Sequence, residues 1–164
     1  MRCHRAIVLA AGLLAACSPV ASSAPAGEAI VVSAVDGDTI VVRLGGTDER
    51  VRLIGIDTPE TKKPDTPVQC YGPEASARTA ALLPPGTRVT LVRDIEARDA
   101  YDRLLAYVYR TDDGLFVNLD LVIGGFARPL RFEPNTAHSD ELSAAADTAR
   151  RGGVGLWAAC PASG

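Results

Sequence analysis

Four consecutive residues, Asp57-Thr58-Pro59-Glu60, bring two carboxylates, a hydroxyl and a rigid turn together. Arg52 lies five residues before Asp57, in a segment whose alternating and β-branched residues predict a strand with one buried face. Such a strand can direct the arginine side chain along the sheet towards its acidic end. A cation that faces a cluster of hard oxygen ligands is the arrangement that metal-assisted phosphoryl chemistry needs.

The same four residues could instead open a helix, with Pro59 in its first turn. Two further prolines follow at Pro64 and Pro67, and they would end such a helix within about two turns. The sequence therefore favours a strand that ends near Asp57 and runs into an exposed loop.

Few other catalytic arrangements fit this composition. The chain has only two histidines; His4 lies in the N-terminal leader described below, and His138 stands alone in a polar turn, which excludes histidine pairs and histidine metal sites. There is no glycine-rich phosphate loop and no serine elbow. What remains are arginines and oxygen ligands, and all-oxygen ligation suits Ca²⁺ or Mg²⁺ rather than zinc. The candidate residues are Asp38, Asp57, the Thr58 carbonyl, Glu60, Arg52 and Arg103.

The overall charge limits how a polyanion could bind. The 164 residues are enough for one domain with its own core, and 17 basic against 20 acidic residues give a formal net charge of -3. A protein that bound nucleic acid mainly by non-specific attraction should be basic. A polyanion would therefore need a local positive patch, and its binding should depend on a metal ion.

Residues 1–17 have the pattern of a bacterial export signal. Arg2 and Arg5 precede an apolar run, 6–16, that is too short to span a bilayer. The run ends in Leu14-Ala15-Ala16-Cys17, which resembles the lipobox of lipoproteins, in which the cysteine is lipidated and becomes the first residue. The alternative is an ordinary signal peptide cut near Ala24. A lipobox predicts a protein anchored on the outer face of the cytoplasmic membrane or in the outer membrane or periplasm. An ordinary signal peptide predicts a secreted protein.

The cysteines fit an exported protein. Cys3 leaves with the signal, and lipidation of Cys17 leaves only Cys70 and Cys160. Two cysteines in an oxidising compartment predict one disulfide; two buried free thiols are the alternative.

The rest of the chain predicts a small barrel. Residues 18–29 are rich in Ser, Ala and Pro and predict a flexible tether, so a single domain would span 30–164. Strands are predicted at 30–35 and 39–44, then in the segment that carries Arg52, and at 87–93 and 104–109; helices are predicted from 71–74 to 83, at 116–123 and at about 139–151. This order fits a five-stranded OB-fold barrel with three α-helices, with an open α+β sandwich as the alternative.

Asp36-Gly37 between the first two predicted strands is a strong hairpin signal. Asp38 follows directly and could be simple turn chemistry. The turn needs only Asp36 and Gly37, however, which leaves Asp38 available for another role.

Three motifs together resemble the thermonuclease (staphylococcal nuclease-like) family. They are Val-Asp-Gly-Asp-Thr at 35–39, Arg-Leu-Ile-Gly-Ile-Asp-Thr-Pro-Glu-Thr at 52–61 and Tyr-Asp-Arg-Leu-Leu-Ala-Tyr-Val at 101–108. No one of them is specific, but their order and spacing are. The resemblance extends from about Ile30 to Trp157.

The resemblance implies an OB-fold, dependence on Ca²⁺ and endonucleolytic hydrolysis of DNA and RNA, with little base preference, 3′-phosphate products and a preference for single-stranded or frayed substrate. It also implies a monomer. By resemblance, Asp38 and Asp57 would bind Ca²⁺ through carboxylates and Thr58 through its carbonyl. Glu60 would be the general base, and the two arginines, Arg52 and Arg103, would hold the scissile phosphate.

The resemblance assigns Asp99, Tyr101 and Phe132 to the substrate pocket, whereas Tyr71 is better explained by packing. It also has departures. Asp102 replaces a glycine and Ala100 a lysine that often holds a terminal phosphate, and 130–132 reads Leu-Arg-Phe where tyrosines are expected. A rival hypothesis is a non-catalytic OB-fold module that binds nucleic acid. Such modules tend to lose the carboxylates or arginines, and all six key residues are present here.

Overall fold

The computed structural model describes residues 25–62 and 67–160 of the chain. The predicted signal peptide with Cys17, and residues 18–24 of the predicted tether, lie outside these residues. Among the helices in the described residues, none is long and apolar enough to cross a membrane.

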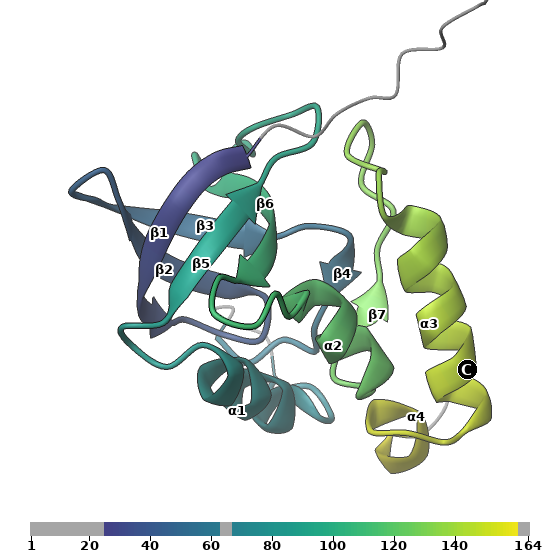
Figure 1. Ribbon diagram of the computed structural model, residues 1–164. Helices are drawn as coiled ribbons and strands as arrows, with labels where there is room; N and C mark the ends of the chain where they lie inside the picture. Colours follow the sequence, from purple (N-terminus) through teal and green to yellow (C-terminus); the bar gives the residue numbers. More distant parts are fainter. Residues whose placement is uncertain (1–24, 63–66, 161–164) are drawn as a thin grey trace, which may run out of the picture.

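Five strands form a closed barrel (Figure 1). They are β1 (Pro25–Ala34), β2 (Thr39–Leu44), β3 (Thr47–Leu53), β5 (Arg88–Val92) and β6 (Leu104–Arg110). Their order around the barrel is β1-β2-β3-β6-β5. All neighbours are antiparallel except β3 and β6, which are parallel. The closed barrel confirms the predicted OB-fold and excludes the open sandwich.

The first strand is longer than its sequence pattern predicts. Residues 25–29 belong to β1, although their composition predicts a tether. They pair with β5, with Pro25 opposite Val92 and Ile30 opposite Arg88. Residues 25–29 do not alternate between apolar and polar side chains. They become a strand because they pair with β5, about sixty residues away in the sequence. Residues 25–29 are therefore part of the barrel and not of a tether.

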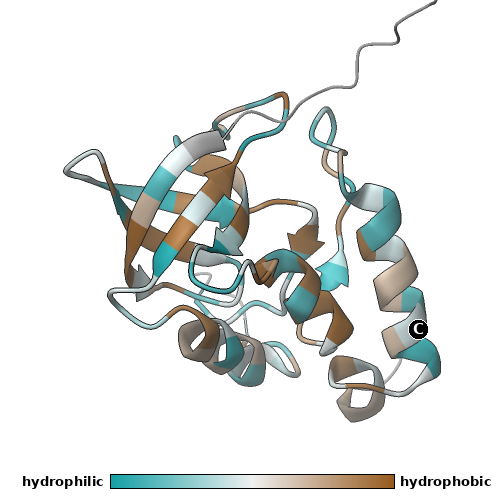
Figure 2. Cartoon of the chain, viewed as in Figure 1, coloured by the Kyte–Doolittle hydropathy of each residue, from teal (hydrophilic) through white to brown (hydrophobic). Residues whose placement is uncertain are grey.

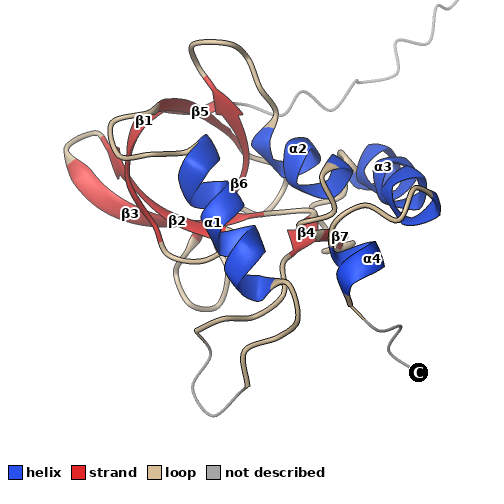
Figure 3. Ribbon diagram, turned by 90° about the horizontal axis from the view of Figure 1, so that it is seen from below, coloured by secondary structure: helices blue, strands red, loops and turns tan. Residues whose placement is uncertain are grey.

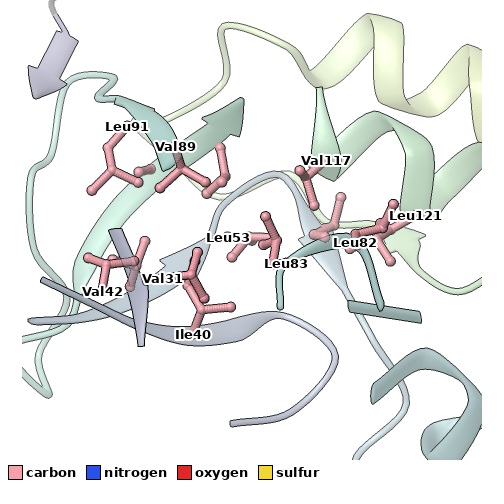
Figure 4. Close-up of a cluster of buried hydrophobic side chains, with 14 of the residues drawn as sticks. Val31, Ile40, Val42, Leu53, Leu82, Leu83, Val89, Leu91, Val117 and Leu121 are labelled. Carbon is pink, nitrogen blue, oxygen red and sulfur yellow. The ribbon is translucent and has the colours of Figure 1, made fainter. Parts of the chain in front are cut away.

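The barrel core consists of the inward residues of each strand and one end of two helices. Figure 4 shows these side chains meeting, and Figure 2 shows the apolar residues alternating with polar ones along the strands. Strands contribute Val31, Ile40, Val42, Leu53, Val89 and Leu91, and the helical layer contributes Leu82, Leu83, Val117 and Leu121. The alternation follows from the period of two along a strand, so the residues between these point outward.

The described residues contain four helices: α1 (Gly72–Leu82), α2 (Val117–Ile123), α3 (Ser139–Arg151) and the short α4 (Leu156–Ala159). Helix α2 packs against β6, and α3 packs against α2 and the short strand β7 (Arg128–Pro129). Helix α1 lies across one end of the barrel (Figures 1 and 3). The α3 sequence is acidic in its first turn and basic in its last, as the helix dipole favours. The first three helices were predicted from sequence, and α4 was not.

Two further links join segments that are distant in the sequence. Strands β4 (Ile56–Asp57) and β7 (Arg128–Pro129) form a separate two-stranded antiparallel sheet. A disulfide joins Cys70, just before α1, to Cys160, just after α4, with their Cα atoms 5.8 Å apart. The disulfide confirms the prediction from the cysteine pattern.

Candidate active site

The turn between β1 and β2 places Asp38 in a buried position. The hairpin is confirmed, but its connection is residues 35–38 rather than Asp36 and Gly37 alone. The Asp38 N–H donates to the Asp36 carboxylate at 3.1 Å, and the Thr79 hydroxyl of α1 donates to the Gly37 carbonyl at 2.6 Å. A Cβ on Gly37 would lie 2.5 Å from the Thr58 Oγ1, so only glycine allows this close approach.

Asp38 is 8 % exposed and binds three donors through one oxygen. Its Oδ2 accepts the Thr58 N–H and the Thr58 hydroxyl, each at 3.0 Å, and pairs with Arg52 at 2.9 Å. The Thr39 hydroxyl donates to its Oδ1 at 3.3 Å. These contacts join the first motif to the second.

Arg52 on β3 connects both predicted metal ligands. Its side chain is 14 % exposed, and it pairs with Asp38 at 2.9 Å and with Asp57 at 3.3 Å. It also donates to the Leu53 carbonyl at 2.9 Å. Asp57 ends β4, and its side chain is 59 % exposed. The arginine does point along the sheet to its acidic end.

Residues 58–62 and 67–71, the described residues between Asp57 and α1, form no helix, as the predicted loop requires. Glu60 Oε1 accepts the N–H groups of Thr61 and Lys62, both at 2.8 Å. The Glu60 main chain is held as well, because its N–H donates to the Gln69 side-chain oxygen at 2.9 Å and its carbonyl accepts the Gln69 N–H at 2.9 Å. Two bonds from one residue thus close the base of the loop that carries the predicted catalytic base.

Asp99 fixes the second arginine. Arg103 Nε donates to Asp99 Oδ2 at 2.7 Å, and the Arg103 and Tyr101 N–H groups both donate to Asp99 Oδ1 at 2.9 Å. The Arg103 guanidinium lies over the Tyr101 ring, 5.6 Å from its centroid. Asp99, predicted to belong to the substrate pocket, thus bonds to Arg103 and to the Tyr101 main chain.

Two adjoining cavities contain the predicted residues. The first, of about 190 Å³, brings together all six predicted key residues, including Arg52 from β3 and Arg103 from the turn before β6. Its lining is Asp36, Asp38, Thr39, Arg52, Asp57, Thr58, Pro59, Glu60 and Arg103. The second, of about 310 Å³, is mostly apolar and shares both arginines with the first; it includes Asp99, Ala100, Tyr101, Leu105, Leu130 and Phe132. The three predicted substrate residues therefore lie beside the arginines.

The oxygen groups in the first cavity fit a hard divalent cation. Within residues 25–62 and 67–160, no three acidic, histidine or cysteine side chains converge as a ready-made metal cluster. The predicted set needs only two, Asp38 and Asp57, with the Thr58 carbonyl as a third ligand, and Ca²⁺ completes its shell with water. Burial raises the pKa of the Asp38 carboxyl, and the Arg52 charge and the Thr58 hydrogen bonds only partly oppose this. A carboxylate buried at such a cost would be stabilised by a bound cation.

The departures from the family pattern leave the arginines in place. Asp102 has φ 61°, the left-handed conformation that glycine usually supplies. Its carboxylate pairs with Arg98 at 3.4 Å, and Arg103 pairs with Asp99. Tyr71 stacks on Phe126, with ring centroids 5.6 Å apart, which agrees with the predicted packing role.

Gln69 and Asn118 support the site, and the sequence analysis did not select either of them. Gln69 is separated from Glu60 by a proline-rich stretch that carries no periodic signal. Asn118 is fully buried in α2 and donates to the Ile54 carbonyl at 2.8 Å. A buried amide within an apolar helix is the one signal that could have indicated Asn118.

Comparison with known proteins agrees with this geometry. A family model described as "Staphylococcal nuclease homologue" matches residues 50–159. The match includes Arg52, Asp57, Glu60 and Arg103 and begins after Asp38, whose position rests on the contacts above.

Similar curated proteins include the thermonucleases of Staphylococcus intermedius and Staphylococcus hyicus. They are 44% and 39% identical over 132 and 127 residues, which cover 80% and 77% of this chain and 77% and 73% of theirs. Endonuclease YncB of Bacillus subtilis is 41% identical over 125 residues, or 76% of this chain and 58% of its own. With its closed five-stranded barrel, the chain belongs to the staphylococcal nuclease family.

Proposed function

We propose that this protein is a Ca²⁺-dependent nuclease that hydrolyses phosphodiester bonds of DNA and RNA with little base preference and leaves 3′-phosphate ends. The observation that carries the proposal is the convergence of Arg52, Arg103 and Glu60 with Asp38 and Asp57 on one cavity. Membership of the family, and relatives named thermonuclease and endonuclease, support the same reaction class.

The two arginines would stabilise the transition state. A pentacoordinate phosphorane carries more negative charge than the phosphodiester, and planar guanidinium groups can bind its oxygens in a bidentate manner. Arg52 is fixed by Asp38 and Asp57, and Arg103 by Asp99. Donors held in this way need little reorganisation when the charge develops.

Glu60 would act as general base. It lines the same cavity as both arginines, and its loop is closed by Gln69. In the proposed step Glu60 takes a proton from water, the water oxygen bonds to phosphorus, and the bond from phosphorus to O5′ breaks. The O5′ atom takes a proton from solvent, and the phosphate stays on the 3′ side.

Asp38, Asp57 and the Thr58 carbonyl would hold the metal. A bound Ca²⁺ supplies positive charge to the phosphate and to the water that is activated. Ca²⁺ acidifies bound water less than zinc does, which is why a separate carboxylate base is needed. The carboxylates that would hold the metal are the same ones that hold Arg52, so Arg52 would contact a phosphate that lies beside the metal site.

The apolar cavity would hold the nucleoside beside the scissile phosphate. Tyr101, Leu130 and Phe132 line it next to both arginines. A base can enter such a cavity only when it is unstacked, so single-stranded or frayed substrate should be preferred. The proposed active protein is a monomer.

Digestion of single-stranded DNA by the mature protein, with Ca²⁺ and with chelator, tests the proposal. Glu60→Gln should lower kcat by about 10²–10⁴-fold without loss of Ca²⁺ binding. Arg52→Lys should be nearly as damaging as Arg52→Ala, because an ammonium group cannot make the bidentate contact. The matched control is Arg43→Lys, an exposed arginine paired with Asp48 away from the cavity.

A second readout does not need turnover. Excess Ca²⁺ at about 100 times its Kd should raise the stability of the wild type by about 2.7 kcal/mol, and Asp38→Asn should reduce this gain. Circular dichroism checks that each variant is folded. Near-normal turnover of Glu60→Gln would exclude Glu60 as the base. DNA binding without any Ca²⁺-dependent cleavage would favour a binding module.

We also propose that the protein is exported and lipidated at Cys17. The support is the sequence Leu14-Ala15-Ala16-Cys17 and the disulfide, which suits an oxidising compartment. The intact mass of the native protein tests this, and a soluble product that begins after Cys17 would contradict it.

A further inference from the structure

Most arginine side chains in the described part of the chain are held by carboxylates. Ion pairs hold Arg43, Arg52, Arg78, Arg88, Arg98, Arg103, Arg110, Arg131 and Arg150. Within residues 25–62 and 67–160, five cationic side chains have no such ion pair: Arg50, Lys62, Arg93, Arg128 and Arg151. Of these, Arg50 and Lys62 lie beside the proposed active site. These two cations come from different segments, and both line one groove beside the proposed active site.

Arg50 shares a face of β3 with the catalytic arginine. Val51 and Leu53 are fully buried and point into the barrel, so Arg50 and Arg52 both leave the strand on its outer side. Two residues of strand separate their Cα atoms by about 6.8 Å. On the outer face of β3, Arg50 is therefore the side chain next to Arg52, which is the proposed phosphate contact.

The groove is continuous with both cavities of the site. Its volume is about 490 Å³, and it is lined by Val35, Asp36, Arg50, Glu60, Lys62, Tyr101 and Arg103. It shares Glu60 and Arg103 with the metal-binding cavity, and Tyr101 and Arg103 with the apolar cavity. A polynucleotide whose scissile phosphate lies at Arg103 must extend beyond it on both sides. The apolar cavity suits a nucleoside on one side, and the groove offers a path on the other.

The chemistry of the groove suits a backbone phosphate. Three cations face two carboxylates in it; Arg103 is engaged by Asp99, and the head groups of Arg50 and Lys62 are available to a ligand. Tyr101 is 83 % exposed at the border between groove and apolar cavity, where its ring can stack on a base. Guanidinium and ammonium groups beside an exposed aromatic ring are typical of single-strand binding surfaces.

We propose that Arg50 and Lys62 form a second phosphate subsite, which binds the backbone of a nucleic acid strand on the groove side of the scissile phosphate. The inference rests on the proposed function and adds to it the path of the polymer. It also explains how an acidic chain can bind a polyanion: the attraction comes from a local pair of cations next to the reacting phosphate. Ala100, which stands where the family often has lysine, makes such a second contact more important.

The test compares a substrate that reaches the groove with one that does not. A thymidylate 12-mer carries phosphates on both sides of the cleaved bond, whereas the dinucleotide dTpdT has only the scissile one. For Arg50→Ala, the ratio of kcat/KM on the 12-mer to that on dTpdT should fall about 3- to 10-fold, and the Arg50→Ala, Lys62→Ala double variant should lower it further. The loss should lie mainly in KM.

Salt dependence gives an independent readout. Each phosphate contact on a single strand contributes about 0.7 to the slope of log affinity against log salt. Removing Arg50 should therefore reduce the magnitude of the slope for the 12-mer by about 0.7. The matched control is Arg43→Ala on the neighbouring strand β2, an exposed arginine outside the groove, for which ratio and slope should match the wild type.

The outcomes separate this inference from the proposed function. Cleavage of both substrates with an unchanged ratio and slope in Arg50→Ala would overturn the subsite and leave the nuclease intact. If the wild type cleaves neither substrate, the proposed function fails, and fluorescence anisotropy of a labelled 12-mer then decides the subsite alone. Weaker binding by Arg50→Ala than by Arg43→Ala supports it, and equal binding refutes it.

Discussion

Asn118 should be one of the most sensitive positions in the fold, because a single amide joins three elements. Its Oδ1 accepts the Val108 N–H of β6 at 3.0 Å, and its Nδ2 donates to the Ile54 carbonyl at 2.8 Å. The side chain is fully buried in α2. Ile54 lies between Arg52 and Asp57, so this bond also fixes the segment that supplies the proposed phosphate and metal contacts.

The magnitude follows from what Asn118→Ala leaves behind. Both backbone groups belong to buried residues, Val108 and Ile54, so bulk solvent does not reach them, and a buried donor or acceptor without a partner costs about 1–3 kcal/mol. Two such groups predict a loss of about 2–6 kcal/mol in the free energy of unfolding. Domains of this size are stable by about 5–15 kcal/mol, so the variant should fold with a much lower urea midpoint.

Asn118→Asp separates the two hydrogen bonds. An ionised aspartate can still accept the Val108 N–H, but it cannot donate to the Ile54 carbonyl, whereas the protonated acid can do both. Its folded pKa should therefore lie above the unfolded value of about 3.9. The stability of this variant relative to wild type should be greatest below that unfolded value and decrease as the pH rises through the folded pKa.

Urea unfolding followed by fluorescence of Trp157, the one tryptophan in the sequence, measures both variants at pH 7 and across the acid range. A loss below about 1 kcal/mol for Asn118→Ala, or a difference between Asn118→Asp and wild type that does not change with pH, would refute the assignment of these two bonds.

Two further perturbations test the supports of the site. Replacing Cys70 and Cys160 by serine should lower the free energy of unfolding by up to about 4 kcal/mol, because their link spans 90 residues of the unfolded chain; an unchanged urea midpoint relative to the oxidised wild type would contradict this. Burial opposes ionisation of Asp99, but donations from Arg103 and Tyr101 outweigh it and hold the pKa of this carboxyl below its ordinary 3.8. Its contribution to stability is therefore complete above the unfolded pKa and is lost as the pH falls through the folded one. Asp99→Asn should be less stable than wild type at pH 7, with a difference that shrinks in acid; a constant difference in pH-dependent urea unfolding would show that ionisation of Asp99 does not matter.

Local patterns predicted the barrel strands and the site motifs because both are encoded over short distances. Burial of alternate residues marks β2 and β3. The antiparallel pairing of β2 with β3 places Thr39 opposite Arg52 and so brings Asp38 beside that arginine. The spacing of the second motif then brings Asp57 within reach of the same arginine. These positions follow from the period of a strand and the register of a hairpin.

The features that the sequence did not predict depend on distant partners. The sheet of β4 and β7 pairs Ile56 with Pro129, and two residues per strand are too few to produce a periodic signal. Residues 25–29 become a strand only through β5. Gln69 supports Glu60 from the far side of a loop. In each case the neighbouring residues in sequence carry no information about the contact, because tertiary pairing overrides local composition.

The distribution of charge in the site suggests a division of labour among the arginines. Arg52 and Arg103 are each fixed by aspartates. These contacts set the orientation of each arginine but also cancel much of its charge at a distance, because a contact ion pair acts as a dipole whose field decreases faster than that of a single charge. Such residues are suited to act on a phosphate that is already in place. The polymer is then attracted mainly by cations that are not paired with a carboxylate. Among the described residues that line the groove, these cations are Arg50 and Lys62. Fixed arginines for the reaction and available cations for the polymer would allow an acidic protein to select phosphodiesters without binding every polyanion tightly.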